Sequence, residues 1–209
     1  MSHTELQIDD LQVMDPALFL DSDPVRLAEQ LIGQFLVSNK AGVKTGGRIV
    51  ETEAYKAPED KACHAHLNRY TKRTSVMFEP GGCTYVYLCY GIHHLLNIVT
   101  GPEGAAHAVL IRAIEPIWGL DIQAERRSGR PQREWTNGPG KLTRALGITT
   151  SDNRQPINTA EANICILKNP KRSVDILAAP RVGIDYAEEC ISWPWRFLDA
   201  KSQFVSVPA

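Results

Sequence analysis

The stretch Arg48-Ile-Val-Glu-Thr-Glu-Ala-Tyr55 is the most informative part of this chain for both fold and function. It follows a pair of turn-forming glycines and is rich in β-branched residues, so it is predicted to be a β-strand. The two-residue alternation of a strand places four side chains on one face: Ile49, Glu51, Glu53 and Tyr55. Carboxylates are costly to bury, so two of them on one face indicate either a functional site or a face open to solvent.

The segments around this strand predict a mixed fold. Asp23-Pro24 begins a helix and Gly33 ends it, because proline suits the first turn of a helix and glycine its end. Strands at 84–89 and 94–99 form a hairpin with Tyr90-Gly91-Ile92 at its tip. The other expected elements are strands near 35–37, 108–114, 163–167, 174–177, 181–184 and 195–198, helices near 119–128 and from Pro139 to Gly147, and loops at 56–76 and 149–159. Few helices among mostly antiparallel strands favour an α+β domain.

Length and composition favour one domain, 1–209, in which residues 1–15 are expected to form a loosely ordered N-terminal segment. A hydrophobic content of 43% and a charged content of 22% are ordinary for a globular protein. The sequence has no apolar run of membrane-spanning length and no signal-peptide pattern. Its five scattered cysteines form no Cys-x-x-Cys pair, which indicates reduced thiols and a cytoplasmic protein.

The net charge of −1 is unusual for a protein that binds nucleic acid. Any such binding must therefore rely on a local basic patch. The candidates are Arg69, Lys72 and Arg73 in one loop, Arg126, Arg127, Arg130 and Arg133 in another, and Lys141 with Arg144. Runs of this kind are usually solvated surface charge unless the fold gathers them on one side.

Three motifs occur in a fixed order along the chain: Glu51-Thr-Glu-Ala-Tyr55, Tyr85-Val-Tyr-x-x-Tyr-Gly91 and Gly138-Pro-x-Lys-Leu142. Together they resemble the alkyladenine (3-methylpurine) DNA glycosylase family, from roughly Leu27 to Val207. The resemblance implies a curved, mostly antiparallel sheet with flanking helices and a hairpin that projects toward DNA. It also implies base-excision repair, in which alkylated or deaminated purines such as 3-methyladenine and hypoxanthine are excised from double-stranded DNA.

The resemblance assigns the catalytic roles to Glu53 and Arg112. A carboxylate near the anomeric carbon stabilises an oxocarbenium-like transition state and deprotonates the attacking water. The family motif places this role on Glu53, with Glu51 as the rival on the same face. Arg112, expected on the Leu110 and Ile114 face of its strand, needs a partner for its charge, and the family match makes that partner Glu53 together with the catalytic water.

The damaged base must leave the duplex before it can reach such a carboxylate. The family match places Tyr55 and Tyr87 on either side of the extruded base, with His64 beside it. Asn97 is expected at the base of the pocket, where it would crowd the exocyclic amino group of guanine. Without the resemblance, tyrosines in strands are more often packing residues, and His64 is an ordinary loop histidine.

Two further roles follow from the resemblance. Tyr90 at the hairpin tip is the residue expected to fill the space that the base leaves in the duplex. Gly138 and Lys141, at the start of a helix, are expected to hold a DNA phosphate, although an ordinary helix start would look the same.

No cofactor or metal is implied, although His64, His66 and Glu53 have a spacing that a metal site could use. Cys63 beside His64 is a weak candidate for a nucleophilic thiol. The family match implies a monofunctional enzyme, expected to be a monomer that acts in the cytoplasm, on the nucleoid if the source is bacterial. The alternatives are a lesion-binding module without catalysis, and a glycosidase that uses Glu51 and Glu53 as a carboxylate pair on free nucleosides.

Overall fold

The strand that carries both glutamates, β2 (Val43–Lys56), lies inside the sheet. It pairs with β5 (His107–Trp118) on one side, and with β1 (Phe35–Lys40) followed by β8 (Arg196–Asp199) on the other. The segment Glu51–Glu53 therefore has a neighbouring strand on each side. The computed structural model from which this is taken describes residues 7–20, 23–157, 159 and 162–209.

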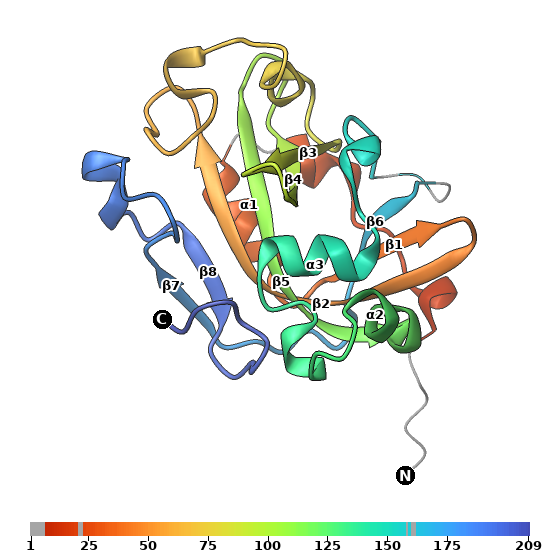
Figure 1. Ribbon diagram of the computed structural model, residues 1–209. Helices are drawn as coiled ribbons and strands as arrows, with labels where there is room; N and C mark the ends of the chain where they lie inside the picture. The colour runs from red at the N-terminus through yellow and green to blue at the C-terminus, as the bar shows by residue number, and fades with distance from the viewer. Residues whose placement is uncertain (1–6, 21–22, 158, 160–161) are drawn as a thin grey trace.

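All the strands of the described residues pair antiparallel in one curved sheet, with β3, β4, β5, β2, β1 and β6 in that order and β7 paired to β8 (Figure 1). The remaining strands are β3 (Thr84–Cys89), β4 (His93–Thr100), β6 (Ile164–Leu167) and β7 (Ile176–Ala179). The α-helices are α1 (Pro24–Leu31), α2 (Leu120–Arg126) and α3 (Pro139–Leu146). Short 3-10 helices span Ile8–Asp10, Pro16–Leu20, His66–Asn68, Ser75–Phe78, Gln132–Glu134, Thr150–Asp152 and Glu188–Ser192. The expected single α+β domain is confirmed.

The helix ends follow the residues expected to set them. The Asp23 carboxylate accepts a hydrogen bond from the backbone N–H of Val25 at 3.1 Å and caps α1, whose first residue is Pro24. Helix α3 begins at Pro139 and ends before Gly147, which adopts the left-handed conformation that glycine tolerates.

The main core lies where α1 and α3 meet the long strands (Figure 1). Leu27 and Leu31 of α1 and Leu142 and Leu146 of α3 are fully buried in it. Burial of each such side chain contributes about 1.5–3 kcal/mol to folding. Both helices thus hold β2 and β5 in place, and these two strands carry the glutamates and Arg112.

A register shift in β2 changes which of its side chains share a face. Ile49 pairs with Ile114, but Glu51 pairs with Ala113, so Val50 is an additional residue in β2. Such a bulge reverses the alternation of the strand. Ile49 and Ile114 therefore both lie in the main core. The prediction that Ile49 shares the face of the glutamates is wrong for this reason.

Because of a second register shift, the Arg112 side chain does not lie on the face of β5 that the sequence predicted. Ala113 pairs with Glu51 and Ile111 with Thr52, so Arg112 is the additional residue of β5. Leu110 lines the cavity described below, whereas Ile114 is a core residue. Arg112 therefore does not share one face with both, and its side chain lies beside the glutamates.

Other sequence expectations also need correction. Residues 181–184 do not form a strand. The Val182 N–H donates to the Glu53 side chain of β2 instead of to a neighbouring strand, and the Arg181 side chain donates to Ala54 of β2 and to Asp60 after it. The strand expected at 174–177 is β7, two residues later. Of the expected N-terminal segment, residues 1–6 lie outside the described residues, whereas Val13 pairs with Leu167 and Met14 is buried. No helix of the described residues is long and apolar enough to cross a membrane.

Candidate active site

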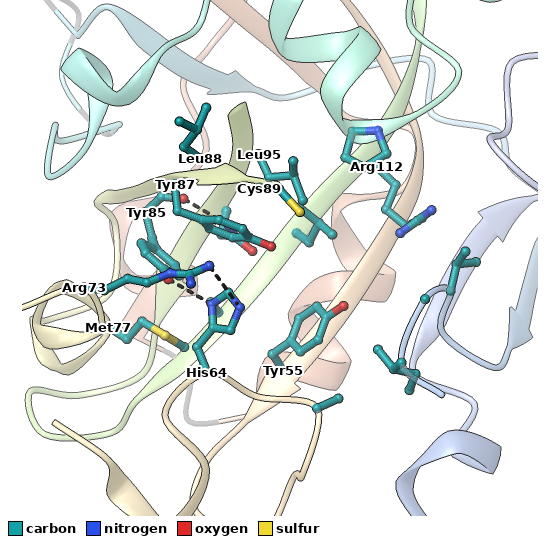
Figure 2. Close-up of a pocket in the computed structure, with 18 of the residues that line it drawn as sticks. Tyr55, His64, Arg73, Met77, Tyr85, Tyr87, Leu88, Cys89, Leu95 and Arg112 are labelled. Carbon is teal, nitrogen blue, oxygen red and sulfur yellow. Dashed lines mark hydrogen bonds between the residues drawn. The ribbon is translucent and has the colours of Figure 1, made fainter. Parts of the chain in front are cut away.

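A cavity of about 510 Å³ opens between the β3–β4 hairpin, β5, the start of α3 and two loops (Figure 2). This volume lies in the range of small-molecule sites. Aromatic and polar side chains from distant parts of the chain line it, among them Tyr55, His64, Arg73, Tyr85, Tyr87, Tyr90, Asn97, Arg112 and Tyr186, together with the backbone of 182–184. The predicted residues Tyr55, His64, Tyr87, Tyr90, Asn97 and Arg112 are therefore brought together at one cavity.

Glu53 lies directly behind this cavity. Its side chain is fully buried and its carboxylate accepts three hydrogen bonds. The Tyr55 hydroxyl donates to Oε2 at 2.8 Å, Arg112 Nη1 donates to the same oxygen at 3.1 Å, and the Val182 N–H donates to Oε1 at 2.7 Å. All three donors line the cavity. These three hydrogen bonds fix the Glu53 carboxylate next to any ligand that occupies the cavity.

Glu51 has a different environment. Its Oε1 accepts from Arg112 Nε at 2.9 Å, from Arg196 Nη1 at 3.1 Å and from the Ser206 hydroxyl at 2.9 Å. Its Oε2 accepts from the Ser206 N–H at 2.6 Å. Of these donors only Arg112 lines the cavity. Glu51 therefore joins β2 to β8 and to the C-terminal segment. Both of its carboxylate oxygens accept hydrogen bonds in this network.

Two aromatic rings and a histidine form the wall of the cavity (Figure 2). Tyr55 shares the face of Glu53, as predicted, and donates its hydroxyl hydrogen to it. Burial, followed by the charge of Glu53 and this hydrogen bond, raises the pKa of Tyr55 well above its ordinary value. The ring of Tyr87 contacts His64 edge-on, with ring centroids 4.8 Å apart.

Both ring nitrogens of His64 are occupied. Arg73 Nη2 donates to Nε2 at 3.2 Å, so Nδ1 carries the hydrogen and donates it to the Tyr85 hydroxyl at 2.9 Å. Burial and the positive charge of Arg73 lower the pKa of His64 from 6.5 to about 4. His64 is therefore neutral at physiological pH.

A buried ion pair stands behind Tyr55. Arg181 forms two hydrogen bonds with the Asp60 carboxylate, at 2.6 and 2.7 Å, and donates to the Ala54 carbonyl at 2.8 Å. Its guanidinium carbon lies 4.8 Å from the centre of the Tyr55 ring and 5.2 Å from that of Trp195. Arg181 thus fixes the position of the Tyr55 ring.

Asn97 is buried and lines the cavity, as expected, and its Nδ2 donates to the Tyr85 carbonyl at 3.0 Å. At the hairpin tip, Tyr90 is 92% exposed and Ile92 is 71% exposed. Tyr90 and Gly91 both have positive φ, at 50° and 73°, as a tight turn requires. Tyr90 is therefore no core residue.

The start of α3 lies against this hairpin. Pro139 lines the cavity, and a Cβ on Gly140 would come within 2.9 Å of His93 Cγ in β4. Lys141 donates to the Asn137 side chain at 3.0 Å on the surface. Gly138 and Lys141 thus lie close to the opening of the cavity.

The basic loops are divided between two places. Arg73 is at the cavity, whereas four arginines cluster at α2 and α3: Arg126, Arg127, Arg130 and Arg144. Burial and the neighbouring Arg144 and Arg130 lower the pKa of Arg127. The sequence alone did not show which of these basic residues would lie at the cavity.

Several site residues carried no sequence signal. Val182 contributes only its backbone N–H, which any residue could supply. The Arg181–Asp60 pair joins residues 121 positions apart. Arg73 was placed only within a basic run, because nothing in the sequence shows that it reaches His64.

Two alternative chemistries find no support in the geometry. Burial raises the pKa of the Cys63 thiol to about 12, which leaves it an inert core thiol. Among the described residues, no three His, Cys, Asp or Glu side chains gather as a metal site requires.

Comparisons with known proteins agree on one family. Residues 18–203 match the family model described as "Methylpurine-DNA glycosylase (MPG)". A protein of Chlamydia pneumoniae named "Putative 3-methyladenine DNA glycosylase" is 50% identical over 182 residues, which cover 86% of this chain and 91% of the relative. A protein of Bacillus licheniformis with the same name is 44% identical over 191 residues, covering 91% of this chain and 95% of the relative.

The depressed pKa of His64 predicts a specific pH dependence of stability. Between about pH 6.5 and pH 4 the unfolded chain binds a proton at His64 that the folded chain does not, so stability falls as the pH falls through this window. His64→Gln removes that dependence. Urea unfolding at pH 7 and pH 5 should therefore show a larger loss of stability in the wild type than in the variant. An equal loss in both would contradict the neutral, hydrogen-bonded His64.

Proposed function

Because the chain belongs to the methylpurine-DNA glycosylase family, we propose that it excises alkylated and deaminated purines, such as 3-methyladenine and hypoxanthine, from double-stranded DNA. It acts as a monofunctional hydrolase in base-excision repair and leaves an abasic site. The observation that carries this function is the buried Glu53 carboxylate, which three cavity-lining donors hold at the rear of an aromatic cavity. We also propose that the protein works as a monomer in the cytoplasm, on the nucleoid if the source is bacterial.

The reaction is hydrolysis of the bond between the base and its deoxyribose. The bond breaks toward the base, positive charge develops on the sugar, and a water attacks the anomeric carbon. Glu53 takes the proton of this water, and its negative charge stabilises the sugar cation. The base leaves with the electron pair of the broken bond: 3-methyladenine, which is cationic in the strand, leaves as a neutral base, whereas hypoxanthine also takes up a proton from solvent. The hydroxyl group that comes from the water remains on the abasic deoxyribose.

Arg112 and Val182 keep Glu53 in position for this step. A buried carboxylate is stable only when charge and hydrogen bonds compensate it, and these two donors and Tyr55 supply both. Because the three donors of Glu53 line the cavity, the cavity is the side from which the attacking water approaches. Glu51, the other carboxylate of β2, is less well placed for this step. Two of its donors, Arg196 and Ser206, do not line the cavity.

The extruded base is held by the aromatic wall. A purine entering the cavity stacks between Tyr55 and Tyr87, which sequence-distant strands place at the same cavity. Asn97, fixed by its bond to the Tyr85 carbonyl, crowds the exocyclic amino group of guanine at the base of the cavity.

The hairpin and α3 engage the duplex. Tyr90, exposed at the tip, inserts into the gap that the base leaves, and its exposure in the free protein is consistent with this role. The start of α3, with Gly138 and Lys141, lies beside the hairpin and binds a DNA phosphate.

The two alternative functions are less well supported. A lesion-binding module without catalysis has no need for a buried carboxylate held by three donors at the cavity. A glycosidase with a carboxylate pair needs both carboxylates at the substrate, and Glu51 is occupied by two arginines and Ser206.

We predict that Glu53→Gln retains binding to lesion-containing duplex but loses base excision by ~10²–10⁴-fold, because an amide cannot accept the proton of water. Excision is measured under single-turnover conditions with a hypoxanthine duplex, followed by alkaline cleavage at the abasic site. Binding is measured with the same duplex by fluorescence anisotropy.

The matched variant is Glu51→Gln, two residues earlier on the same strand. It weakens a buried network, so its main effect is a lower free energy of unfolding, by about 3–5 kcal/mol if the pairing to the arginines is broken. The folded fraction of this variant should still excise the base. Full activity of Glu53→Gln together with an inactive, well-folded Glu51→Gln would reverse the assignment.

Tyr90→Ala should reduce excision more for a well-paired lesion than for a mispaired one, because a mispaired base is easier to unstack. Its melting temperature should stay near that of the wild type, since the side chain is 92% exposed. Ile92→Ala at the same tip is the control for general damage to the hairpin. Equal losses on both lesions, or a melting temperature lowered as by a core truncation, would exclude the insertion role.

A further inference from the structure

Tyr186 lines the cavity, and the proposed reaction gives it no role. It is 65% exposed, so it lies at the opening of the cavity. Its hydroxyl donates to the Ala62 carbonyl at 3.4 Å, which is longer than a typical O–H···O bond, so this contact contributes little to folding. An aromatic side chain that the fold does not require, placed at the mouth of a cavity, indicates a contact with a ligand.

The segment that carries Tyr186 is fixed to the rest of the protein. Ile184, Ala187 and Cys190 are buried and form a small core cluster with Ala62. The N–H of Ala187 donates to the Ile184 carbonyl at 2.8 Å, and the N–H of Cys190 donates to the Ala187 carbonyl at 3.0 Å. The exposed ring of Tyr186 therefore extends from a backbone that core packing and hydrogen bonds hold in place.

The same segment begins at the candidate catalytic carboxylate. The Val182 N–H donates to Glu53 at 2.7 Å, and Tyr186 follows four residues later. Gly183 also lines the cavity, and its φ of 75° is a conformation that favours glycine. The segment therefore leads from Glu53 to the opening of the cavity.

This path is also the place of the sugar in the proposed complex. The extruded base lies between Tyr55 and Tyr87, whereas its deoxyribose stays attached to the strand outside the cavity. The sugar must therefore lie at the opening, with its anomeric carbon toward Glu53. Tyr90, the other exposed tyrosine of the lining, enters the duplex from the hairpin. Tyr186 is the exposed tyrosine that remains to contact the sugar.

The charges around Tyr186 favour the sugar over a phosphate as its contact. Three carboxylates of this segment belong to exposed residues: Asp185, Glu188 and Glu189. Lys61 forms ion pairs with Glu188 at 2.6 Å and with Glu189 at 2.8 Å. Three carboxylates beside one lysine leave the segment negative, which repels a phosphate. An uncharged ring packs against the C–H groups of a deoxyribose without this repulsion.

We propose that Tyr186 is a substrate-binding residue whose ring packs against the deoxyribose of the extruded nucleotide and holds its anomeric carbon toward Glu53. This inference rests on the proposed glycosylase function. Because the contact is made to the sugar, it is the same for every damaged base. Its loss slows excision, because a displacement of about 1 Å at a reacting centre lowers a rate by ~10²-fold.

The test uses a duplex with a tetrahydrofuran abasic-site analogue, which has the sugar ring but no base, and an undamaged duplex of the same sequence. Tyr186→Ala should weaken binding to the analogue by roughly 5- to 30-fold, as for the loss of an interface tyrosine, and leave binding to the undamaged duplex unchanged. Single-turnover excision of hypoxanthine at saturating enzyme should fall by roughly 10- to 100-fold. Tyr186→Phe keeps the ring and should recover most of both losses.

Ile191→Ala is the matched control, because Ile191 is an exposed apolar residue of the same segment and is absent from the residues that line the described cavity. This variant should bind and excise as the wild type does. The melting temperature of Tyr186→Ala should also stay near that of the wild type, since the residue is largely exposed.

Four results would overturn the proposal. Slower excision with unchanged binding to the analogue would mean that Tyr186 contacts the base. Equal losses on both duplexes would make it a general DNA contact, and a melting temperature lowered as by a core truncation would make it structural. A Tyr186→Phe variant as impaired as Tyr186→Ala would assign the contact to the hydroxyl.

The same measurements separate this inference from the proposed function. If the wild type neither excises hypoxanthine nor prefers the analogue to undamaged duplex, the proposed function fails. If the wild type does both and Tyr186→Ala does them equally well, only the role of Tyr186 is wrong.

Discussion

The structure depends on one buried arginine. Arg112 donates from Nε to Glu51, from Nη1 to Glu53 and from Nη2 to the Ser206 hydroxyl. These bonds join β5 to β2 and to the C-terminal segment in a region with almost no solvent access. Removal of one partner from such a network leaves an uncompensated buried charge, at a cost of about 3–5 kcal/mol. The fold and the candidate site therefore share the same interaction.

The two glutamates illustrate how one network gives neighbouring residues different roles. Arg196 supplies a second positive charge, so two arginines and two glutamates balance. Glu51 takes Arg196 and Ser206 as further partners and is enclosed between strands. Glu53 takes Tyr55 and Val182 instead, and both line the cavity. The difference comes from the segment that meets each carboxylate, which is the C-terminal segment at Glu51 and the segment of Val182 at Glu53.

Much of this arrangement was predictable from the sequence, and the exceptions have physical reasons. The strand, the hairpin, α1 and α3 were predicted because their turns and caps use local signals such as Pro24, Gly91 and Gly147. The shared face of Glu53 and Tyr55 followed from the two-residue period. The faces of Ile49 and Ile114 did not, because a bulge depends on pairing with another strand and has no clear signature in one sequence.

The loop contributions were missed for a related reason. Residues 181–184 look like a strand because apolar and β-branched residues occur there, yet Arg181 binds Asp60 and Val182 binds Glu53. These contacts exist only once distant segments meet. The same is true of Arg73, whose basic neighbours made it look like one surface charge among several.

The rings of Tyr55 and Tyr87 each lie against a guanidinium, and the surroundings of the two guanidiniums differ. Arg181 on Tyr55 is buried and paired with Asp60, so it is a fixed part of the scaffold. Arg73 on Tyr87 is exposed and has neutral His64 as its hydrogen-bond partner. The guanidinium at Tyr55 is therefore held by a buried ion pair, and the one at Tyr87 is held by a hydrogen bond to a neutral side chain.

The most direct test of the central claim is a crystal structure of the Glu53→Gln protein bound to a duplex that contains one hypoxanthine. The account predicts that the base lies outside the helix between Tyr55 and Tyr87, and that the anomeric carbon of its deoxyribose faces residue 53. A hypoxanthine that remains stacked in the duplex, or a sugar whose anomeric carbon faces Glu51 instead, would contradict it.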